Sequence, residues 1–235
     1  MERSPSQMDK SKGSKNQEQV IYDRLFDVIL EQKLQPGSRL TEVPLAEIFS
    51  VSRTIIRRVL LRLSHEGVVE IKPNVGASIV STAPEKVSEY FEARKIVEGA
   101  LARKLAGHLT DYQAEMLSAM VREEDRMFEM GNLAKGLRKS TEFHFFIAEA
   151  ADNQPLADIA KQLIARTSLI VSQYNLPGSG GCACIDHNTL VNVLKDGDPS
   201  EAEQMMIEHI NHIEQGLQLN EKTVEPDLYA LLKEN

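Results

Sequence analysis

The chain has 235 residues, of which 27 are Lys or Arg and 35 are Asp or Glu, for a formal net charge of -8. This length allows one large domain or two modest ones, and a hydrophobic content of 42% excludes wholesale disorder. No apolar run reaches the roughly 20 residues that a membrane helix needs. The polar N-terminus has no signal-peptide core, and two cysteines cannot form a disulfide framework. We therefore expect a cytoplasmic protein with no membrane partner.

The negative charge is unevenly distributed along the chain. Residues 1–82 contain 12 Lys/Arg and 10 Asp/Glu, whereas residues 83–235 contain 15 and 25. Within the first part, a short segment concentrates the arginines, at positions 53, 57, 58 and 62. A local basic stripe matters more for phosphate contact than the total charge does, so nucleic acid is not excluded as a partner. A solvated helix face is the alternative interpretation of the stripe.

The first third of the chain reads as helix, helix, tight turn, helix and β-hairpin. Residues 1–16 are polar and predict a disordered arm. Apolar residues then recur at helical spacing from Gln19 to the Pro36-Gly37 turn, and Thr41 and Ser52 are candidate caps of two further helices. Residues 68–71 and 78–80 alternate as two short strands around a glycine-containing loop. This order predicts a winged helix-turn-helix over residues 17–82, in which the third helix enters the major groove of DNA.

The remainder of the chain predicts only helices. Between Pro84 and Leu217, apolar residues keep helical spacing, with breaks at glycine, asparagine and aspartate positions. We predict six or seven antiparallel helices in a bundle over residues 83–220, followed by a tail at 221–235. The expected fold class is therefore mainly α, with a winged helix-turn-helix followed by an all-α antiparallel bundle.

The segment LQPGSRLTEVPLAEIFSVSRTIIRRVLLRLSHEGVVEIKPNVGASIV (34–80) resembles the DNA-binding domain of GntR-type bacterial transcription regulators. The helical part resembles the FCD effector domain of that family's FadR branch, so that the resemblance covers Val20 to Leu217. It implies a homodimer that binds a double-stranded DNA operator and responds to a small-molecule carboxylate effector.

The resemblance also implies which residues contact DNA. Arg53 and Arg57, four residues apart on the third helix, match the paired arginines of the family, and arginine is the usual bidentate reader of guanine. The other implied contacts lie at the start of that helix, beside the second arginine and at the wing tip: Ser52, Thr54, Arg58, Asn74 and Gly76. The chain departs from the family pattern in having Ile55 where proline is common and Arg58 where glutamate is common, which leaves the base preference open.

In the second domain, Arg94 lies in a segment, EYFEARKIVEGALARKLA (89–106), that resembles the first FCD helix. The resemblance implies that this arginine faces the effector cavity and pairs with a carboxylate, which a guanidinium can bind bidentately. An ordinary i,i+4 ion pair on the helix surface between Arg94 and Glu98 is the alternative.

Three of the six histidines, His144, His187 and His209, fall at family positions inside predicted helices with apolar neighbours. If they converge in the bundle, they can form a site for a divalent metal such as zinc or nickel. Metal-binding members of the family place an aspartate one turn before the first histidine, where this chain has Ser140, a poor metal ligand. The site is then a three-histidine centre completed by water and effector, a weak site, or a set of core histidines. We assign Ser140 to the effector cavity.

Cys182 and Cys184 precede His187, and a thiolate there could join a zinc shell. Plain reduced thiols at the start of a helix are the favoured alternative.

Three functions are open at this point. The first is an effector-responsive DNA-binding regulator, with repression as the expected direction. The second is a regulator in which the metal itself is the signal. The third is a three-histidine metal-dependent hydrolase, which would need a general base that the sequence does not place. We expect no enzyme.

Overall fold

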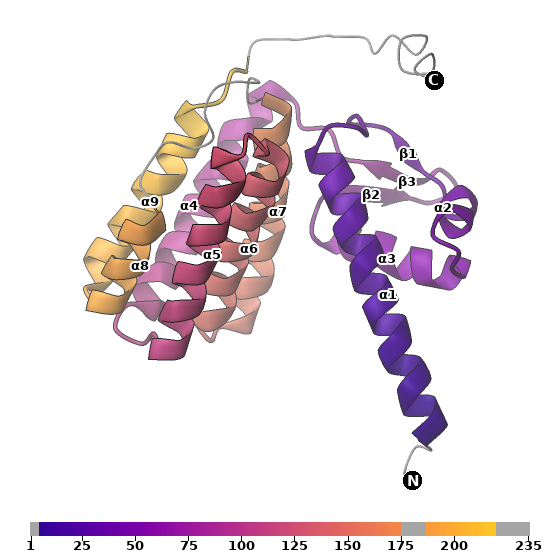
Figure 1. Ribbon diagram of the computed structural model, residues 1–235. Coiled ribbons are helices and arrows are strands. Elements are labelled where there is room, and N and C mark those ends of the chain that lie inside the picture. The colour runs from indigo at the N-terminus through magenta and orange to yellow at the C-terminus, as the bar shows by residue number, and fades with distance from the viewer. Residues whose placement is uncertain (1–4, 175–186, 220–235) are drawn as a thin grey trace.

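The computed structural model describes residues 5–174 and 187–219 of the chain (Figure 1). Its first part contains helices and short strands in the order of a winged helix-turn-helix: α1 (Pro5–Leu30), β1 (Arg39–Leu40), α2 (Glu42–Ile48), α3 (Arg53–His65), β2 (Val69–Lys72) and β3 (Gly76–Ile79). The second part is entirely helical: α4 (Pro84–Leu105), α5 (Asp111–Glu129), α6 (Leu133–Ala150), α7 (Gln154–Tyr174), α8 (His187–Asp196) and α9 (Pro199–Gln215). The expected fold class is confirmed.

The strands form one small antiparallel sheet in the order β1-β3-β2. The predicted hairpin is present, with Val69 opposite Ile79 and Lys72 opposite Gly76. Strand β1 was not predicted, because two residues are too few to show alternation; Arg39 pairs with Ser78 and Leu40 with Ala77. Asn74 and Gly76 both have positive φ, 60° and 98°, so the tip of the wing is a tight turn.

Two predictions in the first part need correction. Residues 5–16, expected to be a disordered arm, belong to α1. Once a helix has nucleated, each further residue adds a backbone hydrogen bond, so a polar segment can extend it without an apolar face. Thr41 and Ser52 do occupy the N-cap positions of α2 and α3, but neither side chain makes a capping hydrogen bond.

The two parts are in contact through α1, α6 and α7. Apolar residues of α1 pack on α3, and two residues of α7, Ala165 and Leu169, join this winged-helix core. Figure 1 shows the bundle α4–α9 beside the winged-helix part, with the N-terminal end of α1 extending away from both. Arg138 of α6 reaches back to α1, where it pairs with Asp23 and, at 3.2 Å, with Asp27.

The bundle has its own apolar core, in which α4 packs along α9 and α5 along α6. Among the described residues, no helix is long and apolar enough to cross a membrane. Cys182, Cys184 and the predicted tail lie outside the described residues, so the structure does not test what was predicted for them.

Candidate functional site

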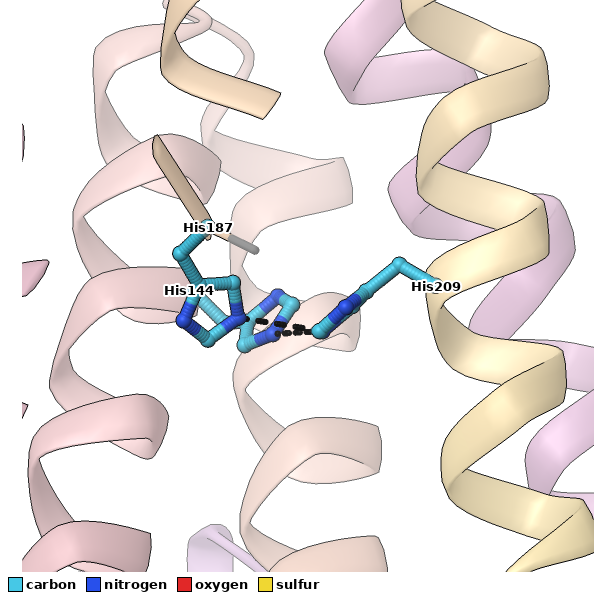
Figure 2. A group of neighbouring side chains, drawn as sticks. All are labelled: His144, His187 and His209. Atoms are coloured by element: carbon cyan, nitrogen blue, oxygen red, sulfur yellow. Dashed lines mark hydrogen bonds between the residues drawn. The ribbon is translucent and has the colours of Figure 1, made fainter. Parts of the chain in front are cut away.

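Three buried histidines from α6, α8 and α9 converge in the bundle. His144, His187 and His209 are exposed by only 1%, 7% and 2%. The Nε2 atom of His209 lies 3.1 Å from that of His144 and 3.0 Å from that of His187, as the dashed lines in Figure 2 show. The three donor atoms all lie within 4.8 Å of one another. The predicted convergence is therefore present.

A buried carboxylate holds the outer nitrogen of two of these rings. Glu98 of α4 lies 2.6 Å from Nδ1 of His144, and Glu124 of α5 lies 2.6 Å from Nδ1 of His187. When Nδ1–H donates to a carboxylate, the lone pair of Nε2 is available at the other end of the ring. Both rings are thus oriented with Nε2 toward the centre of the cluster.

The charges around Glu98 favour a neutral histidine beside an ionised carboxylate. Burial alone would raise the pKa of Glu98, but the charge of Arg94, together with the hydrogen bonds from His144 and Arg94, outweighs it and holds that pKa below its ordinary value. Burial lowers the pKa of His144 below its ordinary value, even though Glu98 opposes the shift. A neutral imidazole is the form that can donate a lone pair to a metal ion.

The donor set fits a borderline divalent cation. Zinc–nitrogen bonds of about 2.1 Å in a tetrahedral shell would separate neighbouring donors by about 3.4 Å. The two Nε2 distances of 3.0 and 3.1 Å are close to this separation. The residues present therefore suit a three-nitrogen site with one position left for another ligand.

Arg94 does pair with Glu98, as in the alternative interpretation, but the pair is in the interior and not on the helix surface. Arg94 is 3% exposed; its Nε donates to Glu98 and its Nη1 donates to Thr167 Oγ1 at 2.9 Å. The guanidinium, Glu98 and His144 thus form a continuous buried chain that ends at the histidine cluster. These two hydrogen bonds leave Nη2 of Arg94 for another partner.

A cavity of about 300 Å³ adjoins the cluster. Arg94 and Ser140, the two residues expected in an effector cavity, line it together with His144 and with hydroxyl groups and apolar side chains of α6 and α7. Leu30, Glu31 and Gln32, at the end of α1, also line it. The cavity therefore lies where the bundle meets the winged-helix part.

The sequence did not reveal the role of Glu124. The signal was present, because Glu124 falls on the buried stripe of α5 with Leu117, Val121 and Met127. A carboxylate on an apolar stripe needs a buried partner, and here that partner is His187.

On the other part of the chain, the predicted DNA-contact residues lie in three places. Arg53 and Arg57 of α3 share a groove of about 690 Å³ with Gly76 of the wing. Arg58 instead pairs with Glu18 of α1 at 2.5 Å, so it belongs to the α1 side of the helix. The exposed residues Ser52, Thr54 and Asn74 lie at the start of α3 and at the wing tip.

Sequence reasoning also missed Glu42, the first residue of α2. Its carboxylate accepts hydrogen bonds from Arg57 at 2.9 and 2.8 Å and from Arg53 at 3.2 Å. The hydrogen bond from Arg57, with the smaller effect of Arg53, holds the pKa of Glu42 below its ordinary value.

Comparison with known proteins identifies both parts. Residues 89–212 match the FCD domain family, and residues 17–79 match the bacterial regulatory proteins of the gntR family. The HTH-type transcriptional repressor RspR of Escherichia coli K12 is 23% identical over 200 residues, which cover 85% of this chain and 88% of that protein. The Uxu operon transcriptional regulator of the same organism is 24% identical over 227 residues, covering 85% and 86%.

Solved structures agree on the fold. Escherichia coli McbR/YncC superposes with a TM-score of 0.67 at 18% identity, covering 85% of this chain and 97% of that one. A GntR regulator structure from Rhodococcus sp. RHA1 gives 0.64 at 16% identity, covering 86% and 100%. The two family matches together span both parts of the fold, and the matched proteins are regulators of transcription rather than enzymes. The chain therefore belongs to the GntR family of bacterial regulatory proteins, as a DNA-binding transcriptional regulator with an FCD domain.

Proposed function

We propose that this regulator is a repressor whose affinity for its operator changes when a small carboxylate binds in the cavity beside the three histidines. The observation that carries the proposal is the composition of the cavity wall. It joins Arg94 and His144 of the bundle to Leu30, Glu31 and Gln32 of the winged-helix part. A volume of about 300 Å³ suits a small metabolite. Relatives that include RspR and NanR are named repressors, which favours that direction of control.

Charge and hydrogen bonding define the carboxylate end of the cavity. Nη2 of Arg94 can bind a carboxylate oxygen, and Ser140 adds a hydroxyl without adding negative charge. A zinc or nickel ion held by His144, His187 and His209 would supply a second positive charge at this end. Because position 140 is not an aspartate, the carboxylate of the small molecule would be the acidic group that contacts the ion directly, while Glu98 and Glu124 lie behind the histidines.

The end of α1 gives the ligand a direct route to the DNA-binding part. A ligand changes an equilibrium only if it binds the two conformations with different affinity. Leu30 is 4% exposed and packs in the winged-helix core, while the same residue borders the cavity. A ligand that fills the cavity therefore contacts the helix on which α3 packs, and can shift the placement of α3 relative to the bundle.

Binding to an operator requires two copies of the chain in this proposal. Recognition helices of a dimer read half-sites about 34 Å apart, which is one turn of DNA. One winged-helix part with Arg53 and Arg57 would contact each half-site.

The test is ligand-dependent DNA binding with the full-length protein and a panel of mono- and dicarboxylates of two to six carbons. We expect at least one of them to raise the melting temperature and to change the DNA gel shift. Arg94→Lys and Ser140→Phe should each abolish both effects, because the first removes the Nη2 donor that faces the ligand and the second fills the cavity. Arg103→Ala is the matched control, since Arg103 lies on the same helix and is half-exposed in a pair with Glu203.

If Arg94→Lys and Ser140→Phe respond like the wild type, the cavity is not the effector site.

A metal-responsive regulator is the second candidate, because Glu98 and Glu124 orient two of the histidines for metal binding whether or not a ligand is present. Dialysis against a chelator, followed by the gel shift with and without zinc, separates the two: metal alone would then change DNA binding.

A further inference from the structure

One carboxylate contacts both arginines that we assign to base recognition. Glu42 is the first residue of α2, and α2 packs against α3. Its Oε1 accepts from Nε of Arg57 at 2.9 Å, while its Oε2 accepts from Nη2 of Arg57 at 2.8 Å and from Nη2 of Arg53 at 3.2 Å. Glu42 therefore bridges two helices of the helix-turn-helix through the side chains expected to face DNA.

The geometry of this bridge leaves part of Arg57 free for a base. The bidentate bond occupies the Nε and Nη2 edge of the guanidinium, so that Nη1 and the second hydrogen of Nη2 are not used by Glu42. Guanine is read by two parallel N–H donors directed at O6 and N7. Without Glu42, an arginine with 59% of its side chain exposed would lose much of its conformational freedom when it becomes ordered on DNA.

The negative charge of Glu42 also favours specific binding over sequence-independent binding. Sequence-independent binding depends on attraction between Lys or Arg and the phosphates. A carboxylate between Arg53 and Arg57 cancels part of their charge, which weakens attraction to any duplex. Contact with the correct bases depends less on net charge and more on the position of the arginine fork.

We propose that Glu42 is a positioning residue that determines DNA specificity, by presenting Arg57 and Arg53 to the bases of the operator and by suppressing their binding to other DNA. The proposal rests on the assignment of these two arginines as base readers.

The experiment compares two duplexes of equal length in a fluorescence-anisotropy titration of the full-length protein. One is selected by the wild-type protein from a random pool, and the other is its scrambled sequence. Glu42→Gln removes the charge, and Glu42→Asp keeps it on a shorter side chain. Glu47→Gln is the control, since Glu47 is exposed on the same helix and the change in charge is identical.

For Glu42→Gln we expect about 5-fold tighter binding to the scrambled duplex, because one opposing charge is lost. Binding to the selected duplex should be about 10-fold weaker, which is the range of one misplaced bidentate base contact. The ratio of the two affinities should then fall about 50-fold. Glu42→Asp should recover part of this ratio, and Glu47→Gln should leave it unchanged.

The proposal is overturned if Glu42→Gln and Glu47→Gln have the same affinity ratio. It is also overturned if Glu42→Gln weakens binding to both duplexes equally and Glu42→Asp does not restore that affinity. If Glu42→Gln lowers the melting temperature, the test is made with Glu42→Asp, and a wild-type affinity ratio for that variant overturns the proposal.

An Arg53→Ala/Arg57→Ala double variant separates the assignment of the two arginines as base readers from the role of Glu42. If it still prefers the selected duplex, the assignment of the recognition helix is wrong. If it loses that preference while Glu42→Gln keeps the wild-type ratio, only the role of Glu42 is wrong.

Discussion

The histidine cluster is organised by side chains other than the three imidazoles. His144 and His187 are each held at Nδ1 by a carboxylate from a different helix, 2.6 Å away in both cases. Such outer partners fix the tautomer and orientation of a ligand and raise its basicity. The affinity of the cluster for a metal should therefore depend on Glu98 and Glu124 as well as on the histidines.

Glu124→Gln tests this dependence. We expect zinc to bind about 10–100-fold more weakly, because the amide orients His187 less well and does not carry the negative charge. The measurement is competition for zinc with a chromophoric chelator. The control is Glu123→Gln, on the same helix, whose carboxylate pairs at the surface with Arg126. Equal zinc affinity in the two variants would contradict a role for Glu124.

At this scale the sequence allowed the three histidines to be predicted but not their partners. The histidines stand out because they fall at positions that match the family, inside predicted helices with apolar neighbours. Glu98 was considered only as half of a surface pair with Arg94, because helical spacing says nothing about depth. Glu124 and Glu42 contact residues 63 and 11–15 positions away, respectively, and no local pattern reports such contacts.

Among the elements, α6 connects the bundle to the DNA-binding part through Arg138. This side chain is only 13% exposed, and it pairs with Asp23, Asp27 and Glu142. Its guanidinium also lies 5.1 Å from the ring centroid of Phe26. Burial alone would lower the pKa of Arg138, but these acidic neighbours raise it, so the side chain stays charged.

Arg138→Ala should lower the free energy of unfolding by about 1–3 kcal/mol, since it leaves partly buried carboxylates without their partner. Chemical denaturation monitored by circular dichroism measures the loss. Lys139→Ala is the control, because Lys139 lies next to Arg138 on α6, is more exposed, and pairs with Glu142 within the same helix. A loss no larger than that of the control would show that the α1–α6 contact contributes little to stability.

A close approach of α5 and α6 gives a second prediction. A Cβ added at Gly136 would lie 2.3–2.7 Å from ring atoms of Phe128, and Phe128 lines the cavity. Gly136→Ala should therefore displace the ring, reduce stability by about 1–3 kcal/mol and weaken ligand binding in the cavity. Thermal unfolding and the carboxylate panel measure both effects.

Gly216→Ala is the matched control, because the nearest atoms to an added Cβ lie 3.5 Å away and the backbone is already in the right-handed helical region. Alanine inside a helix is normally favoured over glycine by up to about 1 kcal/mol. Stability gained by Gly136→Ala would thus contradict the predicted clash.

Element order was largely predictable, and the exceptions have physical reasons. Helical spacing located the helices of the bundle because each buries one continuous apolar stripe. Strand β1 could not be predicted, since its two residues are held by pairing with β3 rather than by their own pattern. The extension of α1 to Pro5 was missed because backbone hydrogen bonding can continue where side-chain patterning stops.

For the whole molecule, the division of charge sets the expected mode of DNA binding. Residues 1–82 carry 12 positive and 10 negative side chains, so one winged-helix part has a weak electrostatic attraction to DNA. Two parts acting together on one operator would be needed for useful affinity.

We therefore expect the protein to have twice its 26.3 kDa chain mass in solution, measured by light scattering after size exclusion. The operator affinity should fall steeply with salt, with a log–log slope of roughly -4 to -7 for about five to eight phosphate contacts. A single-chain mass under conditions of full operator binding would contradict the dimer. A slope near -2 would indicate that only one winged-helix part engages DNA.

The position of α1 has a consequence for how such regulators can be recombined. This helix forms part of the winged-helix core, pairs with Arg138 and closes one wall of the cavity. A chimera that receives a foreign DNA-binding part joined at Thr82 would lose that wall and that ion pair, even with the bundle sequence intact. Functional exchange between relatives should require α1 and the α6 surface that contacts it to be transplanted together. The boundary between exchangeable parts is therefore a surface in the folded protein and not a single position in the chain.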